Sequence, residues 1–124
     1  MVNKMDFFNA VNRNIDMVRG DNLAFNFQLS GLGSSSAYEA LLVTFAVAEQ
    51  YDDVTIIECT KGNGISLESY DAAKDTATFS VFVAPNKTKN LDLARYYYDL
   101  QIKDSSNVVT LMRGRLTLVY DVAD

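Results

Sequence analysis

The chain of 124 residues contains no histidine and no tryptophan, and it has a single cysteine and a single proline. The absence of histidine excludes Ser-His-Asp and Cys-His catalytic groups and most schemes of general base catalysis near neutral pH. One cysteine forms no internal disulfide, and without histidine it leaves too few ligands for a structural zinc site. We therefore expect a protein that is not an enzyme and that holds no cofactor and no metal.

The overall composition excludes further classes. The chain is 48% hydrophobic and 22% charged, which is typical of a folded globular domain. Its formal net charge is −5, and clustered lysine and arginine are missing, so we expect no nucleic acid partner. No apolar stretch approaches the length of a membrane-spanning helix, and residues 1–14 are too polar for a secretory signal, so we expect no membrane partner.

Two short motifs have a functional and a structural interpretation. Arg19-Gly20-Asp21 matches an adhesion tripeptide, but it also fits a glycine turn ahead of a strand, and we favour the turn. The carboxylates of Asp52 and Asp53, and those of Asp71 and Asp75, could bind calcium weakly, but they lack the density of an EF-hand loop. Cys59 is expected to be a packed strand residue and not a nucleophile.

Alternation of apolar and polar residues dominates the chain. Residues 22–29 place Leu23, Phe25, Phe27 and Leu29 on one face, which is the period-two pattern of a half-buried strand. Similar segments follow, separated by turns roughly every ten residues, and the last of them places Leu116, Leu118 and Tyr120 on the inner face. About eight short strands with this spacing predict an all-β fold, specifically an antiparallel β-sandwich of the Ig-like or jelly-roll-like kind. We expect it to span residues 15–124.

Two segments lie outside this pattern or are ambiguous. In residues 37–50 the alternation favours a strand, but Ser36 followed by Glu39 forms a capping-box pattern that would suit a helix. Pro85 should end the strand before it, and one short helical turn is expected near residues 86–93, docking Leu91 or Leu93.

Residues 1–14 show no clear period, and we expect them to form an arm that precedes the domain. The adjacent pair Phe7 and Phe8 needs cover, from the domain or from a neighbouring molecule.

The run "RYYYDLQI" at residues 95–102 contains three consecutive tyrosines. In an extended chain Tyr96, Tyr98, Leu100 and Ile102 share the inner face, and Tyr97 is the one tyrosine of the three that faces outward. The run is therefore mainly the signal of a strand, with one residue available for binding.

Several of these stretches together resemble a known family. "IDMVRGDNLAFNFQL", "ATFSVFVAPNKTKNL" and "RYYYDLQIKDSSNVVTLMRGRLTLVYDV" are similar to the N-terminal domain of phage baseplate upper proteins, over about residues 15–124. The family often has glycine before its tyrosines, where this chain has Ala94 and Arg95, and its members continue into a long C-terminal region. The resemblance implies a β-sandwich component of a virion and no catalytic residues.

We therefore expect a structural component of a bacteriophage particle, such as a tail, baseplate or capsid-associated subunit, located in the virion. Its partners would be other virion proteins and copies of itself, and we expect a homo-oligomer of closed symmetry. Residues expected at the contacts are Phe7, Phe8, Tyr97, Arg113 and Arg115, because tyrosine and arginine are enriched at interfaces. The alternative is a module that binds host-surface glycans, for which Tyr97 and Phe82 are the outward aromatic residues on strands.

Overall fold

The structure is a computed structural model that describes residues 11–51 and 53–120. Within these ranges the chain forms one nine-stranded sheet and two short helical segments. The strands are β1 (Val11–Asn12), β2 (Ile15–Val18), β3 (Leu23–Ser30), β4 (Leu42–Ala48), β5 (Thr55–Lys61), β6 (Gly64–Asp71), β7 (Thr76–Val83), β8 (Arg95–Lys103) and β9 (Val108–Val119). The helical segments are α1 (Ser35–Glu39) and the 3-10 turn η1 (Pro85–Lys87).

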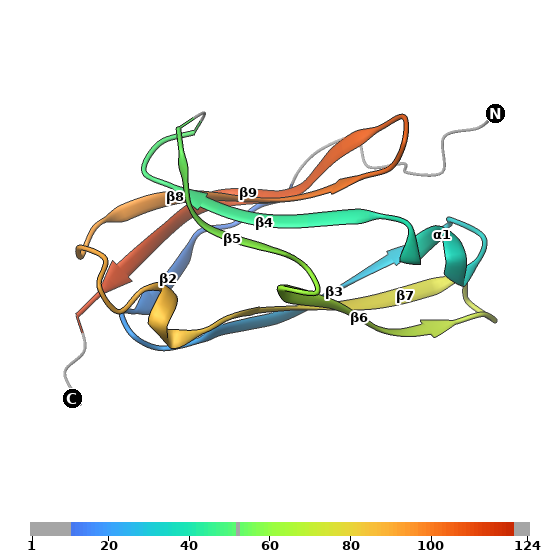
Figure 1. Cartoon of the computed structure of the whole chain (residues 1–124), viewed down its shortest axis with the longest axis horizontal. Helices are drawn as coiled ribbons and strands as arrows, with labels where there is room; N and C mark the ends of the chain where they lie inside the picture. The colour runs from blue at the N-terminus through green and yellow to red at the C-terminus, as the bar shows by residue number, and fades with distance from the viewer. Residues whose placement is uncertain (1–10, 52, 121–124) are drawn as a thin grey trace.

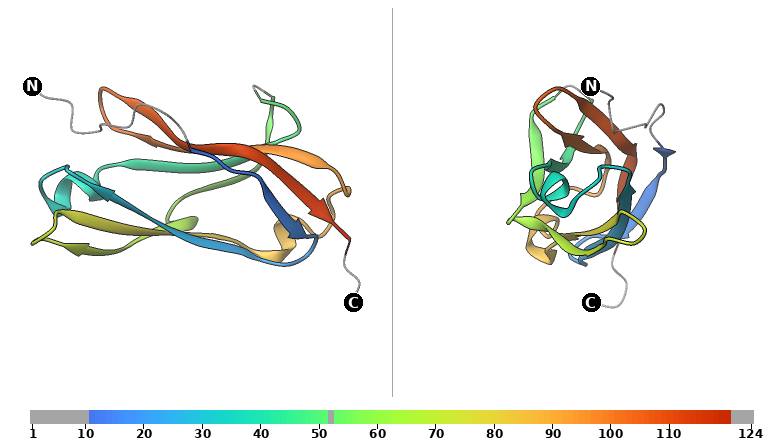
Figure 2. Two further views of the ribbon diagram at one scale, coloured as in Figure 1. Left: turned by 180° about the vertical axis from the view of Figure 1, so that it is seen from behind. Right: turned by 90° about the vertical axis from the view of Figure 1, so that its right-hand side faces the viewer.

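The sheet is long and curls back over itself. Its strand order is β1-β9-β8-β4-β5-β6-β7-β3, and β2 also pairs with β9. Figure 1 shows β4, β8 and β9 running above β3, β6 and β7, with β5 descending from the upper strands to the lower ones. The end-on view in Figure 2 shows the strands arranged around a shared interior. The curled sheet therefore has an upper and a lower layer that enclose one core.

The corner between the two layers lies where β5 meets β6. These strands share two residue pairs, Thr60 with Gly64 and Lys61 with Ile65. Gly64 has a φ of 97°, and a Cβ atom there would lie 2.9 Å from the sulfur of Cys59. A side chain would therefore be both strained and obstructed, so the corner requires glycine at this position.

The expected alternation is confirmed on most strands. The inner rows are buried on β4 (Val43, Phe45, Val47), on β7 (Ala77, Phe79, Val81, Val83) and on β8 (Tyr96, Tyr98, Leu100, Ile102). Leu116 and Leu118 of β9 are also buried, as expected. Tyr120 was expected to point inward, but it is 71% exposed. It follows the last residue of β9, so the alternation of the strand no longer fixes its direction.

The all-β class is confirmed, but the antiparallel sandwich is not confirmed in that form, because the sheet is mixed. β1 and β2 run parallel to β9, and the short contact between β5 and β6 is also parallel. Local alternation does not report strand direction, and the parallel pairing of β2 with β9 joins segments that are about a hundred residues apart.

The ambiguous segment 37–50 contains both the end of a short helix and a strand. The strand is confirmed as β4, and the helical signal belongs to α1 just before it. Ser34, not Ser36, is the N-cap, and its hydroxyl accepts a hydrogen bond from the backbone N–H of Ala37. At the other end the ammonium group of Lys61 donates to the carbonyl oxygens of Tyr38 and Leu41, which satisfies groups that a helix end leaves open.

The helical turn expected near residues 86–93 is present as η1, directly after the strand that Pro85 was expected to end. Leu91 packs against the core, whereas Leu93 is 38% exposed, so Leu91 is the docked residue. Of the expected arm, Val11–Asn12 form β1 in the sheet, while Phe7 and Phe8 lie outside the described residues.

Candidate functional site

Three of the expected contact residues meet on the outer face of the upper layer. In the antiparallel pairing of β8 with β9, Tyr97 lies opposite Arg115, and Asp99 lies opposite Arg113. Strand alternation directs these side chains away from the core, and both arginines are exposed. The register therefore places Tyr97, Arg113 and Arg115 on one surface.

A fourth residue, Tyr51, completes this surface from the loop between β4 and β5. Its ring centroid lies 4.7 Å from that of Tyr97, and the guanidinium of Arg113 lies 4.2 Å from its ring centroid. The Tyr51 hydroxyl donates a 3.1 Å hydrogen bond to the carbonyl oxygen of Gly114. A ring pair and a cation over a ring each contribute about 0.5–1 kcal/mol at exposed sites. We name Tyr51, Tyr97, Arg113 and Arg115 the tyrosine–arginine cluster.

A shallow groove runs beside the cluster along the outer face of β4. Its floor is formed by the small side chains of Thr44, Ala46 and Ala48, and its volume is about 330 Å³. Polar and aromatic side chains from β5, β8 and the loop between β4 and β5 line it, among them Tyr51, Asp53, Glu58, Tyr97, Asp99 and Gln101. Small residues on β4 between taller ones on both neighbouring strands create this depression, which we name the β4 groove.

Asp99 lies between the groove and the cluster. Partial burial raises the pKa of its carboxyl group, and the positive charge of Arg113 opposes that rise. Asp99 faces Ala46 on one side and Arg113 on the other, and Ala46 in turn faces Glu58. The β4 groove is therefore acidic at its walls, while the adjacent cluster carries two guanidinium groups.

Beside the cluster, the segment that connects β1 to β2 passes very close to β9 at Gly114. A Cβ atom at Gly114 would lie 2.0 Å from the carbonyl oxygen of Arg13, so this crossing leaves no room for a side chain. The amide side chain of Asn14 accepts a 3.0 Å hydrogen bond from the backbone N–H of Arg115. The glycine between the two arginines of "MRGRL" therefore lets the N-terminal strands pack against β9, while both arginines face outward.

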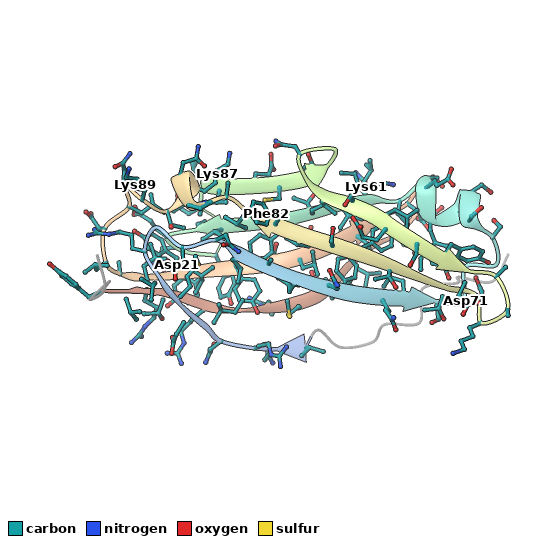
Figure 3. The ribbon with its side chains drawn as sticks, turned by 90° about the horizontal axis from the view of Figure 1, so that it is seen from below. Asp21, Lys61, Asp71, Phe82, Lys87 and Lys89 are labelled. Carbon is teal, nitrogen blue, oxygen red and sulfur yellow. The ribbon has the colours of Figure 1, made fainter. Side chains whose placement is uncertain are left out.

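The sequence predicted three of the four cluster residues and missed Tyr51. Phe82, the other outward aromatic residue expected on a strand, is 48% exposed, but it lies on β7 in the lower layer (Figure 3). Tyr51 follows β4 in a polar turn segment, after Glu49 and Gln50, where no alternation of apolar and polar residues marks its direction. The signal available for it was an aromatic residue in a polar turn, close in register to Tyr97 through the pair Ala48 and Tyr97.

The adhesion interpretation of Arg19-Gly20-Asp21 is not supported by the geometry of this turn. The Arg19 guanidinium donates to the carbonyl oxygen of Leu91, and the Gly20 N–H donates to the buried hydroxyl of Thr88. Gly20 has a φ of 90°, which fits a turn ahead of β3. Arg19 is thus engaged by the loop after β7, although Asp21 is exposed at the same end of the molecule (Figure 3).

The contacts of Cys59 and Asp75 indicate structural roles for both residues. Cys59 is 2% exposed, and burial raises the pKa of its thiol, which disfavours the nucleophilic thiolate. The Asp75 carboxylate accepts hydrogen bonds from the Gly33 N–H and from the hydroxyls of Tyr38 and Tyr70. This carboxylate therefore organises the loop before α1 and the turn between β6 and β7.

In the part of the chain that the structure describes, no group of three or more histidine, cysteine, aspartate or glutamate residues is arranged to hold a metal ion. No helix within residues 11–51 and 53–120 has the length and apolar character needed to cross a bilayer.

Comparisons with known proteins return no family. No protein-family model matches the chain, and no curated protein is significantly similar to it.

Proposed function

We propose that this protein is a structural component of a bacteriophage particle, a tail, baseplate or capsid-associated subunit, and that it acts in the virion through repeated protein–protein contacts. Its partners are copies of itself and other virion proteins. The observation that carries the proposal is the tyrosine–arginine cluster, together with the resemblance of residues 15–124 to a phage virion domain. The contact surface is the outer face of β8 and β9.

The chemistry of the cluster suits a protein interface. Tyrosine and arginine are over-represented at interface positions that dominate binding, because each offers a large contact area with a polar end. Tyr51 is fixed by its hydrogen bond to Gly114 and by the neighbouring ring of Tyr97. Side chains that are already ordered lose less conformational entropy when a partner covers them.

Multi-angle light scattering on the full chain tests the proposal. The unmodified protein is expected to be an oligomer, and Tyr97→Ala and Arg113→Ala are each expected to shift it toward monomer by at least tenfold in dissociation constant. Phe82→Ala is the matched control, because it removes an exposed aromatic residue from the other layer. An oligomer that responds equally to all three substitutions would contradict the assignment of this surface.

The β4 groove supports a second candidate function, binding of host-surface glycans. Sugar sites combine an aromatic face with hydrogen-bonding side chains, and here Tyr51 and Tyr97 stand beside Asp99 and Gln101. The direct test is a glycan array with the full chain. A glycan module gives hits that Asp99→Asn weakens, and a blank array removes this candidate while leaving the assembly proposal intact.

A further inference from the structure

A second and larger groove opens on the other side of the curled sheet. It has a volume of about 660 Å³ and lies between β3 on one wall and β1, β2 and β9 on the other. Its lining includes Val11, Ile15, Phe25, Phe27, Leu111 and Met112. We name it the seam groove, because the two ends of the sheet face each other across it.

The seam groove contains partly exposed apolar surface and borders the edge strand β3. Phe25 and Phe27 are only half-buried, although both contact the core. The ring centroids of Phe25 and Phe45 are 5.7 Å apart, and those of Phe27 and Phe79 are 5.2 Å apart. β3 is the last strand in the sheet order, and in the described ranges it pairs with β7 alone. An edge strand beside an apolar groove is a template for an added strand, whose backbone pairs with the edge and whose alternate side chains fill the groove.

We propose that the seam groove receives residues 1–10 of a second copy of this chain. The inference rests on the proposed function, since it names the docking site for the N-terminal segment in assembly. The segment "MVNKMDFFNA" places Met5 and Phe7 on one side of an extended chain, with Asp6 between them. Ten extended residues span about 33–36 Å, and the eight residues of β3 span about 27 Å, so the segment is long enough to follow the whole edge.

The connection at Val11 favours a neighbouring copy over the same chain. Val11 is itself part of the wall, and from there the wall continues through Ile15 and Asp16. Residues 1–10 of the same chain would have to reverse direction within a few residues to run along that wall. The same segment from a second copy enters without a reversal, and it also leaves its own groove free for the next copy. Such head-to-tail docking generates rings or filaments from one repeated contact.

Disulfide trapping on the full chain tests this inference. The background is Cys59→Ala, which removes the one native cysteine. One preparation carries Phe7→Cys, and a second carries Asn26→Cys, an exposed position on β3 that lines the seam groove. After mixing and mild oxidation, a covalent dimer joined between positions 7 and 26 is expected, in at least tenfold excess over the product obtained when Ser69→Cys replaces Asn26→Cys. Ser69 is exposed on β6 and does not line this groove.

Each outcome of this experiment decides between the proposals. A dimer joined between positions 7 and 26 supports docking in a second copy. Equal yields for positions 26 and 69 overturn it, and so does a double variant, Phe7→Cys with Asn26→Cys, that closes only an intrachain disulfide. Light scattering on the same samples distinguishes a wrong docking site from the absence of assembly. An oligomer without the cross-link overturns the docking site alone, whereas a monomer at every concentration overturns the proposed assembly and the docking site together.

Discussion

The hydroxyl of Tyr98 donates a 2.6 Å hydrogen bond to the carbonyl oxygen of Arg13. The bond joins the middle of β8 to the crossing between β1 and β2, across 85 residues of sequence. The Tyr98 side chain is 1% exposed, so its hydroxyl reaches this carbonyl from within the core. The last of the three consecutive tyrosines thus fixes the N-terminal strands, while Tyr97 next to it faces the surface.

Replacing Tyr98 with phenylalanine should lower the free energy of unfolding by about 1–2 kcal/mol, because the Arg13 carbonyl loses its partner while the ring still fills the core. Urea unfolding followed by circular dichroism measures the change. Tyr120→Phe is the control, since Tyr120 is 71% exposed, and it should change stability by less than about 0.5 kcal/mol. Equal effects of the two substitutions would show that the bond between Tyr98 and Arg13 does not stabilise the fold.

Gly114→Ala should be more damaging than Tyr98→Phe. The added Cβ would meet the carbonyl oxygen and carbon of Arg13 at 2.0 and 2.7 Å, and backbone atoms cannot rotate away as a side chain can. We expect a loss of about 3 kcal/mol in the free energy of unfolding, at the upper end of the usual range for overpacking. Thermal unfolding measures it, with Thr117→Ala on the same strand as the control. A melting temperature unchanged from that of the unmodified protein would mean that the crossing between β1 and β2 is not packed as described.

Asp75 combines two roles that substitutions can separate. It has a φ of 48°, in the left-handed region that asparagine and aspartate tolerate better than other side chains, and its carboxylate accepts three hydrogen bonds. Asp75→Asn keeps the backbone preference and one acceptor, so it should cost about 1 kcal/mol, whereas Asp75→Ala should cost about 3 kcal/mol. Urea unfolding of both variants checks this order. Equal losses would assign the whole effect to the charge of the carboxylate.

Asp99 predicts a pH-dependent effect on stability. Its pKa in the folded protein lies above the ordinary value of 3.8, because partial burial disfavours the charged form more than Arg113 favours it. The folded state then binds this proton more tightly than the unfolded chain, so the contribution of Asp99 to stability falls as the pH rises from 3.8 through the raised pKa.

Asp99→Asn removes this ionisation. The variant should therefore gain stability relative to the unmodified protein at pH 7, and the gain should disappear near pH ~3, where both states of Asp99 are protonated. Urea midpoints measured at the two pH values give the comparison. A variant that is less stable than the unmodified protein at pH 7 would show that the attraction between Asp99 and Arg113 outweighs the effect of burial.

Local pattern predicted most of the strands and their inner rows. The inner rows of β4, β7 and β8 follow directly from period-two alternation, and Pro85 marked the end of β7 as expected. The direction of β2 could not be predicted, because its parallel pairing with β9 depends on contacts between the two ends of the chain. The same long-range contacts create the need for Gly114, which looks like an ordinary strand glycine in the sequence.

The strand residues of the candidate site could be predicted from the sequence, but its loop residue could not. Strand alternation was enough to direct Tyr97, Arg113 and Arg115 outward. Tyr51 belongs to a loop, whose conformation no periodic pattern describes, and its contact with Tyr97 depends on how β4 turns into β5. The seam groove was also absent from the prediction, since an open side of a curled sheet follows from the complete strand order and not from any one segment.

Assembly of this protein through contacts between copies is tested most directly by the molar mass of the unmodified full chain, measured by light scattering over a hundredfold range of concentration. We expect a mass of two or more chains of 13.8 kDa at high concentration, which either falls on dilution or remains constant because the oligomer is closed. A mass of one chain at every concentration would contradict assembly through contacts between copies.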